Sequence, residues 1–145
     1  EQANSIPPGV AHPIGALMAH ILHCEDFMVN TAVQGKQTLW ERDGWGAKVG
    51  GEMMVDLDAA KARAYKRDPK AMSEYAGVVF ANTDAFLGSL KDNDLERELE
   101  LTSFGFPNNM SLGTFLTTML LGNTYAHTGE ISSLKGLLGA KGYPF

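Results

Sequence analysis

The sequence predicts an all-α protein, and three observations support this prediction. Apolar residues recur every three or four positions over three long stretches, residues 12–33, 69–90 and 111–139, which is the spacing of a helix packed along one side. Proline, glycine and capping residues stand at the boundaries of these stretches. No two segments alternate apolar and polar residues regularly enough to form a sheet.

The longest helix is expected from Ser111 to Gly139. Ser111 suits an N-cap, and Gly139 suits the helix end because glycine tolerates a positive φ. One face of this helix carries three polar residues in its middle, Asn123, His127 and Glu130. A buried polar group without a partner costs about 1–3 kcal/mol, so these side chains need partners from another element. The apolar ends of the same face are Leu112, Leu116, Met119, Leu134 and Leu137.

The first long helix places Pro13 in its first turn, where the missing N–H costs nothing. His20 and His23 lie three positions apart beside its apolar stripe. We expect His23 to be partly exposed, and Glu25 and Asp26 to lie on a solvated or interhelix face. The stripe expected to be buried is Ile14, Leu17, Met18, Ile21, Cys24 and Met28.

A glycine-rich segment follows the first helix and contains Trp40 and Trp45. We interpret it as an ordered loop, because two tryptophans are poor candidates for full exposure. After it, a short helix to about Arg67 can begin at Asp56 or Asp58, since either aspartate can cap a helix.

One short helix and three long ones make an incomplete bundle. The second long helix begins at Asp68-Pro69, a capping residue followed by a proline at the first helical position. A four-helix bundle needs a fourth amphipathic partner. We therefore expect a helix upstream of residue 1, or one supplied by another subunit. The 145 residues are otherwise expected to form a single domain, 1–145.

Composition narrows the classes of partner. The formal charge is −5, and the twelve Lys and Arg residues are scattered, which disfavours nucleic acid and anionic membrane surfaces as partners. No run of residues is apolar and long enough for a membrane span. Cys24 is the single cysteine and cannot form an intrachain disulfide, so we expect a cytoplasmic protein.

The candidate chemistry lies between the first and last long helices. Antiparallel packing of the two would bring His20 near Asn123 and His127. Two imidazoles and an oxygen ligand make a partial shell for Zn²⁺, Ni²⁺ or Fe²⁺, with positions open to water or a substrate. Alternatively, the same side chains hydrogen-bond to one another or to Glu130 in a polar core without a metal.

Three segments of the chain resemble the DinB-like superfamily of metalloenzymes. They read HPIGALMAHILHCEDFMVN, QGKQTLWERDGW and HTGEISSLKGLLGAKGYPF. The resemblance implies an up-down-down-up four-helix bundle whose first helix is missing or truncated here, and a homodimer. It also implies a metal held by one histidine of the family's second helix and by a His-x-x-x-His pair of its last helix. The family's second helix corresponds to residues 12–33 here. By resemblance, His20 and His127 are ligands, and Asn123 stands where the family has its third histidine.

The resemblance leaves two hypotheses for the function. The first is a divalent-metal-dependent transferase or hydrolase acting on a small molecule, with a low-molecular-weight thiol such as mycothiol or bacillithiol as a cofactor. In it, Glu130 completes the metal shell or accepts a proton. The second is a non-catalytic dimeric helical module with a degenerate metal site, because an amide oxygen is a poorer ligand than imidazole for these metals.

Overall fold

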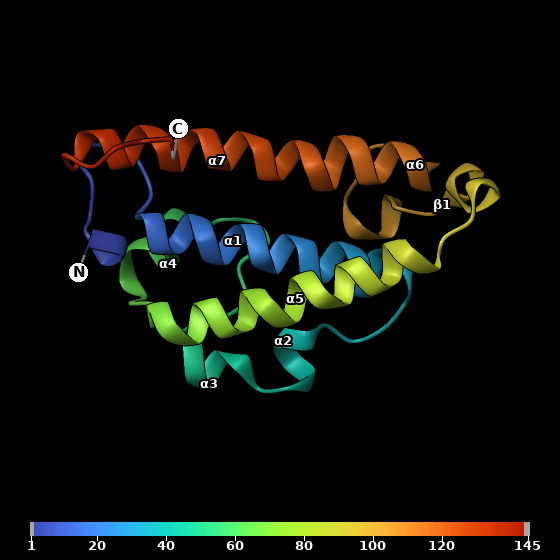
Figure 1. Cartoon of the computed structure of the whole chain (residues 1–145), viewed down its shortest axis with the longest axis horizontal. Helices are drawn as coiled ribbons and strands as arrows, with labels where there is room; N and C mark the ends of the chain where they lie inside the picture. Colours follow the sequence, from blue (N-terminus) through green and yellow to red (C-terminus); the bar gives the residue numbers. More distant parts are fainter. Residues whose placement is uncertain (1, 144–145) are drawn as a thin grey trace.

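Three long helices lie side by side and confirm the all-α prediction (Figure 1). The structure is a computed structural model that describes residues 2–143. In it, α1 lies between α5 and the last helix and contacts both. No helix of this described part is long and apolar enough to cross a membrane. The long helices are α1 (Ile14–Asp26), continued by the π-helical η2 (Phe27–Val33), α5 (Pro69–Ser89), and the continuous α6 (Leu112–Thr114), η5 (Phe115–Leu121) and α7 (Gly122–Leu137).

The central helix α1 is enclosed on nearly every side, which corrects two expectations for it. Met18 of the expected stripe is 42% exposed, and His23, expected to be partly exposed, is 0% exposed. Asp26 is 1% exposed and lies on the interhelix side of the two faces considered for it. Glu25 is buried as well. The reason is that α1 packs against several elements, among them α2 and α4, so its polar side also faces protein. A one-sided stripe therefore underestimates what is buried.

The last helix begins and ends as expected, but its buried face differs. The Ser111 hydroxyl accepts a hydrogen bond from the Thr114 amide, and Gly139 has φ +78°. Phe115 is fully buried, although it lies outside the expected face, and Leu137 is 74% exposed. Two features explain this: the π-helical turns of η5 rotate the helix face, and α7 runs past the start of α1 (Figure 1).

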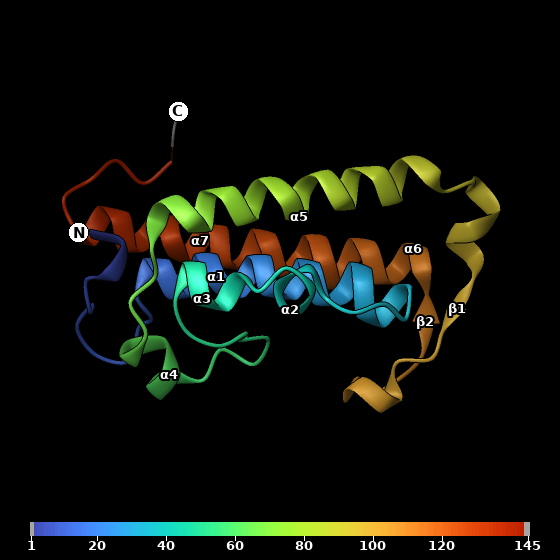
Figure 2. The ribbon, with the colours of Figure 1, turned by 90° about the horizontal axis from the view of Figure 1, so that it is seen from below.

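The tryptophan segment forms two short helices rather than a loop. Trp40 and Trp45 are both buried, and their rings pack against Tyr75 of α5, with centroids 5.3 and 5.4 Å away. Asp58, rather than Asp56, caps the next short helix by accepting the Lys61 amide. The short α-helices are α2 (Leu39–Arg42), α3 (Trp45–Val49) and α4 (Ala59–Ala64), and Figure 2 shows α2 and α3 in front of α1.

The connection between α5 and α6 contains a small sheet that the sequence did not predict. Strand β1 (Glu98–Leu99) pairs antiparallel with β2 (Met110–Ser111). Two residues a strand are too few to show an alternating pattern, so the sequence carries no signal for it. The described part of the chain also contains three 3₁₀ helices: η1 (Gln2–Asn4), η3 (Asp92–Glu96) and η4 (Thr102–Phe104).

An apolar groove lies between α5 and α7, with α1 as its floor. Side chains that line the groove include Met18, Ile21, Phe80, Leu87, Leu121 and Thr124.

The expected fourth helix, upstream of residue 1 or from another subunit, lies outside the described residues and stays a prediction.

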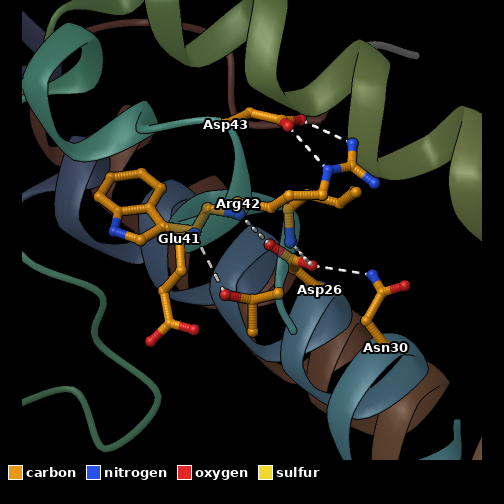
Figure 3. A network of polar contacts seen from close by, with 8 residues as sticks. Asp26, Asn30, Glu41, Arg42 and Asp43 are labelled. Atoms are coloured by element: carbon orange, nitrogen blue, oxygen red, sulfur yellow. Dashed lines mark hydrogen bonds and ion pairs between the residues drawn. The ribbon is translucent and has the colours of Figure 1, made fainter. Parts of the chain in front are cut away.

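Asp26 joins α1 to α2 and α5 at the centre of the core. Its two carboxylate oxygens accept the backbone amides of Leu39 and Trp40, each at 2.8 Å, and so cap the start of α2. The Tyr75 hydroxyl donates at 2.7 Å and the Asn30 amide at 2.9 Å. Figure 3 shows Asn30 pointing at Asp26. Burial and the neighbouring carboxylate raise the pKa of Tyr75, so its hydroxyl stays a donor.

Replacing Asp26 with asparagine should lower the free energy of unfolding by about 2–4 kcal/mol. An amide has one acceptor oxygen, and its NH₂ group would face the donors that the carboxylate now satisfies. Urea denaturation followed by circular dichroism measures the change. Asp43→Asn is the matched control, because Asp43 only pairs with Arg42 at the surface (Figure 3), and it should leave the midpoint unchanged. Equal midpoints for both variants would contradict this role of Asp26.

Candidate functional site

His20 of α1 and His127 of α7 meet between the two helices. Their imidazole rings are T-shaped, with centroids 4.7 Å apart. His20 is buried and His127 is half-buried. The structure therefore brings together the two histidines that sequence analysis selected as a pair, and no layer of aliphatic side chains separates them.

Each of these histidines has one ring nitrogen fixed by a partner. His20 Nδ1 lies 3.0 Å from the Met54 carbonyl oxygen, which can only accept, so Nδ1 carries the proton. His127 Nδ1 lies 3.0 Å from Glu130 Oε2 and donates to that carboxylate. In the neutral form of both rings Nε2 is then the unprotonated nitrogen, and that of His20 lies 3.6 Å from the Cys24 thiol. A second partner of this kind is what orients histidines that bind metals.

His23 also hydrogen-bonds to the backbone of Met54, but as an acceptor rather than a donor. The Met54 amide N–H donates to His23 Nδ1 at 2.9 Å, so the proton of His23 is on Nε2. The centroid of its ring lies 4.2 Å from that of the Trp40 ring. Burial, with the nearby Arg67 charge, lowers the pKa of His23 to about 3. His23 is therefore a neutral, structural histidine that holds Met54 in place.

The surroundings keep His20 neutral near pH 7. Burial lowers its pKa, and proximity to His127 lowers it further. The Met54 carbonyl, the Asn123 side chain and the Asp56 charge act in the opposite direction. Asn123 is thus close enough to interact with His20, and all three predicted ligand residues lie at one locus. Glu130 reaches the locus through His127.

A cavity of about 260 Å³ lies next to the site. Cys24 links the two, because its Sγ lies 3.6 Å from His20 Nε2 and also lines the cavity. Burial raises the pKa of Cys24 to about 12, so it stays a thiol. Sequence analysis missed this cavity, because its residues come from three distant segments without a shared motif. It is lined by Cys24, Phe27, Met28, Val55, Asp56, Phe104 and Phe106.

The residues present suit a divalent metal in part. Two imidazoles that share a tetrahedral ion through bonds of about 2.1 Å hold their ring centres roughly 5 Å apart, close to the observed 4.7 Å. Asn123 adds an amide oxygen. Within residues 2–143, however, no three His, Cys, Asp or Glu side chains converge on one point. The donor set is two nitrogens and a weak oxygen, one strong ligand short of a typical zinc site.

Comparison with known proteins gives a shared fold and no function. No protein-family model and no curated protein matches the chain. The crystal structure of a conserved protein from Enterococcus faecalis is similar, with a TM-score of 0.75 over 95% of this chain and 82% of the other, at 16% sequence identity. At that identity the similarity shows the fold alone.

The protein should lose stability as the pH falls below about 6.5, and His23 should account for part of the loss. Its pKa is about 3 in the folded protein against an ordinary 6.5, so over this interval the unfolded chain binds a proton that the folded chain does not. The slope from this one group approaches 1.4 kcal/mol per pH unit at most, as a rough upper value. Urea unfolding at pH 4 to 8 measures it.

The matched variant for that measurement is His23→Gln, whose side-chain oxygen can still accept the Met54 amide but does not titrate. Between pH 6 and 4, the free energy of unfolding of this variant should fall less steeply with pH. The difference is up to about 1.4 kcal/mol per pH unit, which corresponds to one bound proton. Parallel curves for the two proteins would show that His23 is not held neutral.

Proposed function

We propose that the protein is a divalent-metal-dependent enzyme of the DinB-like type that acts on a small molecule. His20 and His127 are the strong ligands in this proposal, and Asn123 is a weaker oxygen ligand. The observation that carries it is the pair of facing rings whose Nδ1 atoms are each bound to a partner, which leaves the Nε2 atoms as the nitrogens that can bind a metal. The resemblance of the sequence to the family supports the same assignment.

The chain's own groups prepare the site for such an ion. Met54 holds His20 in the tautomer whose Nε2 is a ligand, and burial keeps that ring neutral. Glu130 engages His127 Nδ1, which makes it a positioning residue in this proposal rather than a free proton acceptor. A bound divalent metal would supply Lewis acidity, which makes a water or a low-molecular-weight thiol a better nucleophile near neutral pH.

The alternative is a non-catalytic homodimeric module with a degenerate metal site, binding a small ligand or a partner. The residue at position 123 favours it, because an asparagine there removes one of three imidazoles. The lack of a third His, Cys, Asp or Glu at the site, within the described residues, favours it too. Both functions use the same fold, so metal content separates them.

Metal analysis of the protein, purified without a histidine tag or added metal, tests the proposal. We expect about one equivalent of Zn, Ni or Fe, and its loss in both His20→Ala and His127→Ala. His12→Ala is the matched control, because His12 precedes α1 and lies outside the site, and it should keep the metal. Metal-free protein that also fails to bind added Zn²⁺ would leave the non-catalytic module.

Two substitutions should change Zn²⁺ affinity in opposite directions. Asn123→His restores a third imidazole one helical turn from His127 and should tighten binding by at least about tenfold, or ~1.4 kcal/mol. Glu130→Gln keeps the size of the side chain but removes the charge that supports His127, and should weaken binding roughly 10–100-fold. Competition with a chromophoric chelator measures both. An unchanged affinity in Asn123→His would mean that residue 123 does not face the ion.

A further inference from the structure

The cavity beside His20 has a lining that suits one aromatic ring. It is lined mainly by apolar side chains, three of them phenylalanines. Two of these rings, Phe27 and Phe104, already pack edge to face with centroids 5.5 Å apart. Aromatic pairs and ring faces of this kind favour a further aromatic partner.

The volume of the cavity sets the size of the ligand. A cavity of about 150 Å³ is enough to hold benzene in another protein, and this one measures about 260 Å³. This volume is enough for one ring with a short substituent. The floor at Cys24 adjoins His20, so a ring in this cavity lies beside the candidate metal ligands.

The charges around the cavity select among ring substituents. Among the residues that the structure describes, Asp56 is the only charged one in the lining. The nearby Lys61 forms its ion pair with Glu52, at 2.9 Å, and interacts with Asp56 only through its charge. The faces of phenylalanine rings attract cations, and the chain carries a net charge of −5, which steers cations toward it. Each of these terms favours a positive ligand over a negative one.

We propose that the cavity lined by Phe27, Phe104 and Asp56 binds a small aromatic amine, with the ring among the phenylalanines and the ammonium group toward Asp56. This inference rests on the proposed function only for the ligand's role as a substrate. The binding itself requires no metal. It narrows the substrate class to compact aromatic cations and disfavours carboxylates of the same size.

Three probes with the same ring and different charge test the inference: benzylamine, benzyl alcohol and benzoate. Their dissociation constants are measured on the whole chain by two-dimensional NMR titration at pH 7. Benzylamine should bind roughly threefold to tenfold more tightly than benzoate, with the alcohol between them. Asp56→Asn should remove most of the difference between amine and carboxylate.

Phe104→Ala should weaken all three probes by roughly threefold to tenfold through loss of an aromatic contact. The side chain of Phe104 is 40% exposed, so the substitution removes little core packing. Phe80→Ala is the matched control, because Phe80 is 49% exposed and lines the α5–α7 groove instead, and it should not change binding.

The inference is overturned if benzoate binds as tightly as benzylamine, if none of the probes binds saturably, or if Phe104→Ala binds like the unchanged protein. Amine binding without any metal would keep the cavity assignment and remove the enzyme. Metal binding without amine binding would keep the proposed metal site and reject the amine site. The two proposals can therefore fail separately.

Discussion

The backbone N–H and C=O of Met54, each hydrogen-bonded to a histidine of α1, make the contact on which the site depends. The Met54 carbonyl accepts from His20, and the Met54 N–H donates to His23. Because the two bonds run in opposite senses, they fix opposite tautomers in histidines only three residues apart. The His20 ring, unprotonated at Nε2, packs against the His127 ring. These two hydrogen bonds also position the residues that follow Met54, so Val55 and Asp56 line the cavity.

The polar residues of α1 have different tasks because α1 is the central helix. His20 and His23 bind the Met54 loop, whereas Asp26 caps α2 and accepts from Tyr75 of α5. Burial is also what keeps His23 neutral and Cys24 protonated. The fold and the candidate site thus have one origin: buried polar groups on α1 that hydrogen-bond to other segments of the chain.

The sequence predicted what is local and periodic. The three long helices and caps such as Ser111, Asp58 and Asp68 followed from spacing and residue type. The pairing of His20 with His127 followed from antiparallel packing. The hydrogen bonds of His20 and His23 to the Met54 backbone could not be predicted, because a backbone group has no signature in the sequence. The π-helical turns that bury Phe115, and the cavity built from distant phenylalanines, likewise depend on tertiary packing rather than on local pattern.

The most direct test of the shared site is NMR of the ring nitrogens in protein labelled with ¹⁵N-histidine, before and after one equivalent of Zn²⁺. The account predicts that His20 and His127 carry their protons on Nδ1 and that both Nε2 resonances shift together on adding Zn²⁺. His23, with its proton on Nε2, should not move. A shift of only one of the two facing histidines, or of neither, would contradict the claim that they bind one ion.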